Sequence, residues 1–440
     1  MLYAEIFSDF GIFVDFLPII CYNRNTERGV CMVTRHEYLE KLKLWREEKV
    51  IKVVTGIRRC GKSTLLEQYK EYLIETGIMP EQIVAVNFED LAYEELLDYK
   101  KLYEYLSEHI VSNGYTYIFL DEIQKVNGFE KVVDSFYIKD NVDIYITGSN
   151  AYLLSGELAT LLSGRYVEIK MLPLSFSEYA QLQTSGKSND ELFNEFMSEG
   201  GFPYIVAMDR TKEKTDMYLE GIYNTIIVKD IEERQTRREP DTTKRKISDI
   251  SLLKNIAKFL AGSVGSLISV RSVSDYIVSL GRKVSPNTVS DYIDALTEAF
   301  IFYPVERFDI QGKQLLQQNQ KLYIADTGLR RYMPPRRNYD LGFTLENIIY
   351  LELCRRGYEV YVGKNGSTEV DFVVKKNDVM EYYQITASLT DETTFKREIT
   401  PLQNIRDNYP KTILTLDRFT LGDYEGIKVE NAVDWLLKAQ

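Results

Sequence analysis

Histidine and cysteine are scarce in this sequence. Two histidines, His36 and His109, occur among its 440 residues, which argues against histidine-based catalysis and against a histidine-rich zinc site. The four cysteines are scattered and lack the paired spacing of a metal site. Because such usage is typical of a reducing compartment, we expect a cytoplasmic protein.

A basic excess and a membrane-spanning run are missing as well. The net charge is -12 and the pI is about 5.1, which argues against a surface coated by nucleic acid, although a local basic face remains compatible. The apolar run at residues 10–22 contains Asp15 and is too short to cross a bilayer. It is a buried or interfacial segment, a poor signal peptide, or part of an extension outside the native chain, whose start would then be Met32.

The stretch from residue 51 to residue 66 has the pattern of a buried strand, a glycine-containing loop and a helix. Its loop matches the spacing G-x-x-x-x-G-K-[ST] of the phosphate-binding loop. The glycines let backbone N–H groups curl around a phosphate, the lysine places a positive charge on the terminal phosphates, and the serine hydroxyl ligates magnesium. The predicted nucleotide-binding residues are Gly56, Ile57, Arg58, Arg59, Cys60, Gly61, Lys62, Ser63 and Thr64.

A second apolar strand ends in two acidic residues, Asp121 and Glu122. Downstream of a phosphate-binding loop, this pattern predicts that Asp121 binds magnesium together with Ser63 and that Glu122 polarises the attacking water. Taken alone, the pattern would also fit an acidic helix cap. We therefore expect ATP and Mg²⁺ as the cofactors.

A third strand, residues 142–148, is followed by Ser149 and Asn150, and Arg165 precedes a fourth strand. Either polar residue is a candidate sensor of the γ-phosphate, although Gly-Ser-Asn is also ordinary turn chemistry. The arginine is a candidate to stabilise transition-state charge, in its own chain or in a neighbouring subunit, or it forms a surface salt bridge. Because strands alternate with helices, we expect a parallel sheet covered on both faces, with these residues at the carboxyl ends of its strands.

Together these motifs resemble those of a prokaryotic AAA-type ATPase family whose members carry a C-terminal region of unknown function. The matching segments are GIRRCGKS at 56–63, FLDEIQ at 119–124, TGSN at 147–150, LSGR at 162–165, LPLSF at 172–176, GGFP at 200–203 and KDI at 229–231. The resemblance covers nearly the whole sequence from Met32 onward. It implies binding of ATP and its hydrolysis to ADP and phosphate.

Residues 173–246 are expected to form a helical lid and a charged linker, which is solvated or contacts a phosphate backbone. Residues 247–335 have the helix, turn, helix and strand pattern of a winged helix, whose last helix enters the major groove in DNA-binding members. That helix carries Asp291, Asp294 and Glu298 with few cations. A structural or protein-docking role is therefore as compatible as DNA binding.

Residues 336–440 resemble the restriction-endonuclease-like fold. In that fold a helical Glu, a strand Asp and a following (Asp/Glu/Gln)-x-Lys ligate magnesium and activate water. The residues that match are Glu346, Asp371 and Gln384. Thr386 occupies the lysine position, so we expect a degenerate site that does not cleave DNA, unless Lys364 or Lys375 supplies the charge.

The sequence thus predicts an α/β protein with a parallel-sheet P-loop core. The expected segments are 1–31 as an extension, 32–172 as the ATPase core, 173–246 as lid and linker, 247–335 as winged helix and 336–440 as nuclease-like domain. The leading interpretation is an ATPase whose cycle is a conformational switch for the C-terminal domains; the alternatives are a DNA-binding regulator with ATP as a ligand and a metal-dependent nuclease. No membrane partner is expected, and DNA, a protein client and a homo-oligomer are left open.

Overall fold

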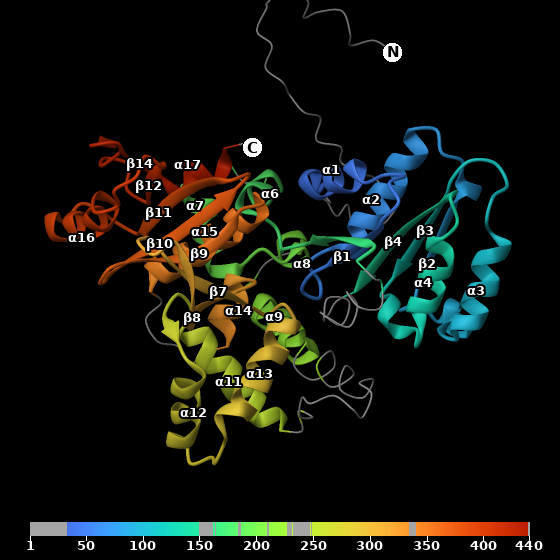
Figure 1. Cartoon of the computed structure of the whole chain (residues 1–440), viewed down its shortest axis with the longest axis horizontal. Coiled ribbons are helices and arrows are strands. Elements are labelled where there is room, and N and C mark those ends of the chain that lie inside the picture. Colours follow the sequence, from blue (N-terminus) through green and yellow to red (C-terminus); the bar gives the residue numbers. More distant parts are fainter. Residues whose placement is uncertain are drawn as a thin grey trace, which may run out of the picture.

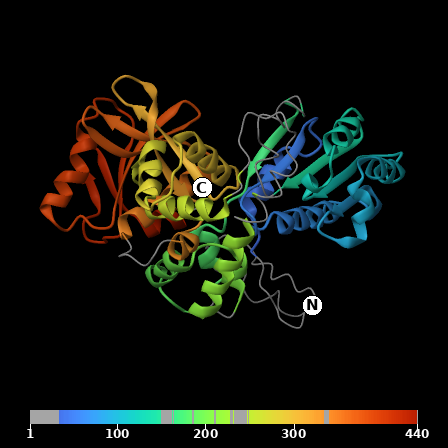
Figure 2. The same cartoon turned by 90° about the horizontal axis from the view of Figure 1, so that it is seen from below.

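Two β-sheets organise the part of the chain that the structure describes (Figure 1). The structure is a computed structural model, and it describes residues 33–148, 162, 164–183, 186–208, 211–226, 231, 247, 249–333 and 340–438. The first sheet, coloured blue to cyan-green, lies at one end of the molecule, and the second, orange to red, lies at the other. Seen from below, the green lid helices lie between the two sheets (Figure 2).

The first sheet is parallel throughout. Within the described residues its strand order is β2-β3-β4-β1-β5. The strands are β1 (Ile51–Thr55), β2 (Ile83–Asn87), β3 (Thr116–Asp121), β4 (Val142–Gly148) and β5 (Tyr166–Lys170). Alternate residues of β1, β3 and β4 face two separate apolar clusters, which is why these strands read as continuous apolar runs. The expected parallel sheet, covered on both faces, is confirmed.

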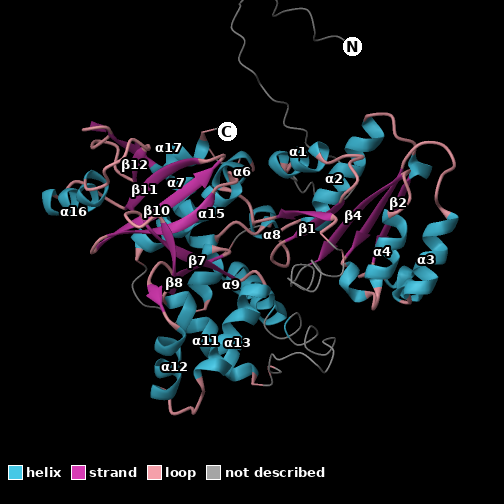
Figure 3. Cartoon of the chain, viewed as in Figure 1, coloured by secondary structure: helices cyan, strands magenta, loops and turns pink. Residues whose placement is uncertain are grey.

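Helices pack on both faces of this sheet (Figure 3). They are α1 (His36–Leu44), α2 (Lys62–Glu75), α3 (Tyr99–Glu108) and α4 (Phe129–Tyr137), together with the 3₁₀ helices η1 (Pro80–Gln82), η2 (Leu91–Leu97) and η3 (Ile123–Lys125). In the described part of the chain, no helix has the length and apolar character needed to cross a membrane.

The segment expected to form a lid contains α6 (Phe176–Gln181), α7 (Asn189–Glu199), α8 (Pro203–Ala207) and α9 (Lys212–Asn224). Helices α6 and α7 each begin with a capping box, in which a serine and a glutamate satisfy each other's backbone N–H groups. Gly200 ends α7 with φ +85, an angle that glycine adopts without strain. The chain can therefore turn sharply and bring Pro203 against the nucleotide-binding loop.

The second sheet is mixed and contains nine strands among the described residues, in the order β13-β14-β12-β11-β10-β9-β7-β8-β6. Its strands are β6 (Leu267–Ile268), β7 (Phe302–Asp309), β8 (Gln314–Ile324), β9 (Glu359–Asn365), β10 (Thr368–Lys376), β11 (Val379–Thr386), β12 (Lys411–Thr415), β13 (Gly422–Tyr424) and β14 (Ile427–Asn431). The helices of this half are α11 (Ile250–Gly262), α12 (Val270–Ser279), α13 (Pro286–Glu298), α14 (Thr327–Tyr332), α15 (Leu341–Arg355), α16 (Glu392–Gln403) and α17 (Ala432–Leu437). The helices α11, α12 and α13 followed by the strand pair β7 and β8 match the order expected for a winged helix, whereas the short strand β6 was not expected. The winged helix stays a prediction.

One expected boundary does not match the strand pairing. The sequence placed a winged helix at 247–335 and a separate domain at 336–440, but β7 pairs in parallel with β9, starting at Arg307 and Val362. Both segments therefore contribute to one sheet. Pairing with β9 satisfies backbone N–H and C=O groups that β7 would otherwise leave at an open edge. Local periodicity cannot reveal a pairing between strands so far apart in the sequence.

Candidate nucleotide-binding site

The loop between β1 and α2 requires glycine at two positions. Gly56 has φ +142 and Gly61 has φ +104, backbone angles that residues with a side chain rarely adopt. A Cβ on Gly56 would also lie 2.1 Å from the carbonyl oxygen of Met171, which no side chain tolerates. The loop therefore curls closely over the end of β1 and leads directly into Lys62, the first residue of α2.

The ammonium of Lys62 points into the curl of the loop. Its Nζ donates to the carbonyl oxygen of Gly56 at 3.1 Å and to that of Ile57 at 3.4 Å, and the residue is only 4% exposed. The positive charge lies at the N-terminus of α2, where the helix dipole also favours an anion. This end of the helix is therefore suited to a phosphate.

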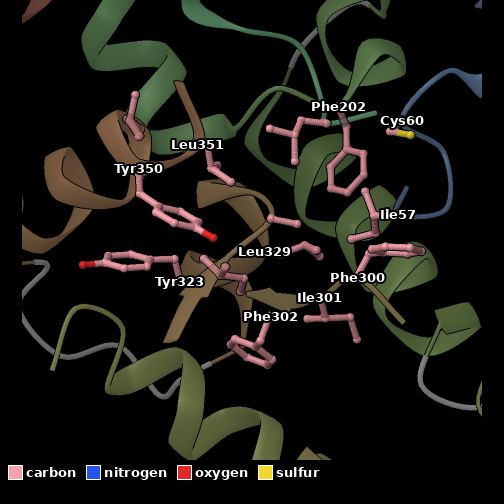
Figure 4. Close-up of a cluster of buried hydrophobic side chains, with 14 of the residues drawn as sticks. Ile57, Cys60, Phe202, Phe300, Ile301, Phe302, Tyr323, Leu329, Tyr350 and Leu351 are labelled. Atoms are coloured by element: carbon pink, nitrogen blue, oxygen red, sulfur yellow. The ribbon is translucent and has the colours of Figure 1, made fainter. Parts of the chain in front are cut away.

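The other loop residues divide between the core and the pocket. Ile57 and Cys60 are fully buried and belong to an apolar cluster that also includes Phe300 (Figure 4); burial raises the pKa of the Cys60 thiol. Arg58 forms an ion pair with Glu89 at 2.8 Å. The loop residues that line the pocket are Arg58, Arg59, Gly61, Lys62, Ser63 and Thr64.

The acidic pair lies at the end of β3, beside the loop. The Asp121 carboxylate accepts hydrogen bonds from the hydroxyls of Ser63 and Thr147. Burial raises the pKa of Asp121, and the two hydroxyl donors act against that rise. Glu122 donates its backbone N–H to Thr147 Oγ1 at 2.9 Å, and its carboxylate accepts a hydrogen bond from Gln124. The residues that the sequence named for phosphate, magnesium and water therefore meet in one place.

A pocket of about 600 Å³ opens beside these groups. Its apolar wall comes mostly from the lid and consists of Val33, Leu174, Leu182, Pro203, Tyr204, Ala207 and Tyr218. The rings of Tyr204 and Tyr218 lie 4.8 Å apart. An anion-binding loop, Glu122 and an aromatic wall line this cavity, and Asp121 lies next to it through its contact with Ser63. These groups match the parts of a nucleoside triphosphate with its magnesium. ATP and Mg²⁺ therefore fit the residues present.

The remaining predicted catalytic residues have different outcomes. Ser149 and Asn150 lie outside the described residues. The carbonyl oxygen of Arg165 accepts the N–H of Ile51 at 2.9 Å, so Arg165 lies beside the first residue of β1, whereas the loop follows the last. Five strand residues span roughly 16 Å. Arg165 therefore cannot reach the phosphates of its own chain, and its guanidinium lies instead 3.9 Å from Asp134 and over the Tyr137 ring.

Two of the three predicted nuclease-like residues, Glu346 and Asp371, lie near a lysine that the sequence interpretation did not include. Lys321 Nζ, on β8, lies 2.9 Å from Glu346 Oε1, 2.8 Å from Glu369 Oε1 and 3.9 Å from Asp371 Oδ1. Lys321 is buried, and although burial lowers its pKa, the facing carboxylates outweigh that effect and raise it. Among the described residues, no group of three or more His, Cys, Asp or Glu side chains is arranged to hold a metal ion.

The other residues considered for the nuclease-like site have partners of their own. Gln384 accepts the N–H of Asp371 at 3.3 Å and donates to Glu398 at 2.8 Å. Thr386 donates its hydroxyl to the Ser388 carbonyl. Lys375, one of the two substitutes considered from the sequence, lies over the rings of Phe308 and Tyr361 instead.

Sequence reasoning missed three residues that the structure places beside the predicted site residues: Arg35, Thr147 and Lys321. Arg35 precedes α1 and donates to the Cys60 carbonyl in the nucleotide-binding loop at 3.0 Å. Thr147 was part of a quoted motif, but its link to the acidic pair depends on how β3 and β4 align. A lysine within an apolar strand, as in Lys321-Leu322-Tyr323-Ile324, is a signal that a buried carboxylate lies opposite.

Two family models and a solved structure resemble parts of this chain. An AAA domain model matches residues 48–180, and a model described as a domain of unknown function matches residues 190–342. The Walker-type ATPase of Pyrococcus abyssi, a solved structure, is 16% identical with a TM-score of 0.48, covering 70% of this chain and 98% of that chain. A structural likeness of this size carries no argument about function.

Two sequence relatives match over most of their length. An uncharacterized protein from Haemophilus influenzae is 39% identical over 411 residues, 92% of this chain and 99% of that protein. An uncharacterized protein from Methanocaldococcus jannaschii is 30% identical over 371 residues, 79% of this chain and 77% of that protein. The chain therefore belongs to the same family as these two uncharacterized proteins, and its phosphate-binding loop lies within an AAA domain of the P-loop ATPase type.

Proposed function

We propose that the protein binds ATP with Mg²⁺ and hydrolyses it, and that this cycle is a conformational switch for the C-terminal half. The main support for ATP binding and hydrolysis is that Lys62, Ser63 and Glu122 line one pocket, while Asp121 accepts a hydrogen bond from Ser63 beside it. Lys62 and the loop N–H groups would bind the terminal phosphates, and Ser63 and Asp121 would hold the metal, which neutralises phosphate charge when bound. Glu122 would polarise the attacking water.

Support for the conformational switch begins at Arg35, whose buried guanidinium donates to three acceptors. Its guanidinium donates to the carbonyl oxygen of Cys60 in the nucleotide-binding loop, to that of Leu172 after β5 at 2.8 Å, and to Glu178 of α6 at 2.8 Å. Burial raises the pKa of Glu178, but the guanidinium groups of Arg35 and Arg355 outweigh it, so that pKa lies below its usual range. A single side chain thus joins the loop to the lid.

Arg355 continues the same network into the C-terminal half. It lies at the end of α15, donates to the Pro173 carbonyl at 3.0 Å, and pairs with Glu352 at 2.5 Å. Leu172 and Pro173 are consecutive residues. A displacement of this segment would therefore change the hydrogen bond of Arg35 to the Leu172 carbonyl and that of Arg355 to the Pro173 carbonyl. Apolar packing follows the same route, because Ile57 and Cys60 of the loop share one cluster with Phe300 and Tyr350 (Figure 4).

The first test is ATP hydrolysis by the purified chain with Mg²⁺, with and without DNA. Turnover that is independent of DNA supports the ATPase proposal. Tight ATP binding without turnover, accompanied by ATP-dependent DNA binding, would favour a regulator that uses ATP as a ligand. The acidic residues of α13 argue against that regulator, as does the net charge of -12.

The second test follows hydrogen exchange in α15 with ATP, with ADP and without nucleotide. We expect protection at α15 to change with nucleotide in the wild type. The reason is that Arg355 of α15 contacts Pro173, and Arg35 links the adjacent Leu172 to the nucleotide-binding loop. The change should be lost in Arg355→Met and kept in the matched control Arg356→Met, whose side chain contacts Glu352 and Trp435 within the C-terminal half. Identical exchange in all three nucleotide states would refute the switch.

Arg165 enters this proposal only through a second subunit. Its side chain is 44% exposed and lies at the edge of the sheet opposite to its own loop, an arrangement that would let it reach a neighbouring pocket. Native mass measurement with nucleotide tests this assembly. A strict monomer under turnover conditions would remove any catalytic role for Arg165.

A further inference from the structure

The hydroxyl of Thr147, near the end of β4, bridges the two acidic residues of the nucleotide site. Thr147 is fully buried and lies beside Val54 of β1. Its Oγ1 donates to Asp121 Oδ1 and accepts the backbone N–H of Glu122 at 2.9 Å. One oxygen atom therefore holds the side chain of the first acid and the backbone of the second.

The hydrogen bond from the Glu122 N–H to Thr147 involves an unusual backbone conformation. Glu122 has φ +57, in the left-handed region that residues with a side chain seldom occupy. Such a conformation persists where surrounding contacts hold it, and these positions gather at functional sites. The hydrogen bond to Thr147 is one such contact, and Gln124 holds the carboxylate of the same residue.

We propose that Thr147 is a positioning residue for the metal–nucleotide site. Its hydroxyl sets the orientation of the Asp121 carboxylate toward the magnesium ion and the backbone turn that directs Glu122 toward the water. This inference rests on the proposed ATPase function. Thr147 acts through the two acids, so nucleotide binding in the absence of metal, which depends on Lys62 and the loop, does not require it.

Two substitutions at this position separate the hydroxyl from the shape of the side chain. Thr147→Val removes the hydroxyl and keeps a β-branched side chain suited to a buried strand, whereas Thr147→Ser keeps the hydroxyl. Thr116→Val is the matched control. Thr116 is also fully buried, and its Oγ1 accepts the N–H of Val111 at 3.0 Å, but it lies at the other end of β3 from Asp121.

The experiment uses the full chain and measures both binding and turnover. Titration calorimetry gives the affinity for ATP in EDTA and its dependence on Mg²⁺, and steady-state kinetics gives kcat and KM. For Thr147→Val we expect unchanged affinity in EDTA, a roughly 10- to 100-fold weaker magnesium effect, and a similar fall in kcat, the usual scale for losing a partner of a metal ligand. Thr147→Ser and Thr116→Val should both behave like the wild type.

Two results would overturn the inference. One is a Thr147→Val protein whose magnesium dependence and kcat equal those of Thr116→Val. The other is an equal loss of affinity with and without metal, which would show a structural role alone. If Thr147→Val does not fold, Thr147→Ala is compared in its place. A wild type that binds Mg·ATP without hydrolysing it would refute the proposed function, while the magnesium dependence of binding would still decide the role of Thr147.

Discussion

At the scale of single residues, we expect different residues of the nucleotide site to serve ATP binding and ATP hydrolysis. Lys62 lies inside the loop and carries the positive charge that faces the phosphates, whereas Glu122 lies at the strand end, where water would be activated. These two roles are proposals, and each can be tested by one substitution with a nearby control. The two variants should fail in different ways, because one acts on ground-state binding and the other on the chemical step.

Lys62→Ala should abolish tight ATP binding. The substitution removes the charge that compensates the terminal phosphates, and charge-assisted hydrogen bonds contribute about 1.5–3 kcal/mol each, or roughly 10- to 100-fold in affinity. Isothermal titration measures the loss. Lys70→Ala is the control, since Lys70 lies on the same helix and pairs at the surface with Glu67. Unchanged affinity in Lys62→Ala would show that the loop does not bind the phosphates.

Glu122→Gln should still bind ATP with magnesium but turn over at least ~100-fold more slowly, the usual scale for losing a general base. The carboxylate that polarises water is lost, while Ser63 and Asp121 keep the metal. The measurement is a single-turnover assay. Glu89→Gln alters another pocket carboxylate, one that pairs with Arg58, and should be much less impaired. Near-normal hydrolysis by Glu122→Gln would assign the base to another residue.

At the scale of elements, Asp326 joins the lid to the C-terminal half. It caps α14, accepts the N–H of Gly201 at 2.6 Å and that of Leu329 at 3.2 Å, and is almost completely buried. A Cβ on Gly200 would lie 2.2 Å from its Oδ1, and a Cβ on Gly201 would lie 2.5 Å from the carbonyl oxygen of Leu174. Neither glycine of the GGFP segment at 200–203 therefore has room for a side chain. The GGFP segment thus contacts the C-terminal half through Gly201 and lines the pocket through Pro203.

Burial raises the pKa of Asp326 to about 6 from 3.8, against the effect of its backbone donors. The folded state therefore binds more protons than the unfolded state between pH 3.8 and 6, and the contribution of Asp326 to stability rises as the pH falls through this window. The shift from 3.8 to about 6 corresponds to a contribution of about 3 kcal/mol to the free energy of unfolding at low pH. In urea unfolding, the wild type should gain stability relative to Asp326→Asn as the pH falls.

Asp340→Asn is the control, because Asp340 is a helix-capping aspartate at the surface. The difference in free energy of unfolding between the wild type and Asp340→Asn should not grow in the same way as the pH falls. A difference between wild type and Asp326→Asn that stays constant from pH 7 to pH 4 would mean that Asp326 does not titrate in this range.

The strands and helices around Lys321 also bear on nuclease activity. We predict no magnesium- or manganese-dependent cleavage of supercoiled plasmid by the full chain. The Lys321 ammonium lies within 2.9 Å of both Glu346 and Glu369, so these carboxylates are already paired with a cation, and Thr386 carries no charge that could activate water. Nicking that disappears in Asp371→Ala would show that the site is active.

At the scale of the whole molecule, the ATPase core and the C-terminal half are packed together. One apolar cluster runs from Tyr38 and Ile57 through Phe202 to Tyr323 and Tyr350, and the buried arginines follow the same direction. Hydrophobic contact over this extent favours movement of the parts as packed bodies rather than independent tumbling. The second sheet adds to this, because β7 and β9 tie the three-helix segment to the strands that follow it.

The nucleotide-binding loop, the strand before it and the acidic pair could be predicted from the sequence, because each is encoded in contiguous residues. Glycine spacing sets the loop angles at Gly56 and Gly61 wherever the loop occurs, and an apolar run followed by two acids places them at a strand end. The alternation of strands and helices was enough to predict a parallel sheet.

The contacts between residues far apart in the chain could not be predicted and come from the folded structure. It placed Arg165 at the far edge of its own sheet, joined β7 to β9 across an expected domain boundary, and set Lys321 among the carboxylates that a metal would need. It also brought Arg35 to Cys60 and Thr147 to Asp121. Each of these contacts depends on strand register and on packing between segments far apart in the chain, and neither is expressed in the local pattern of residues.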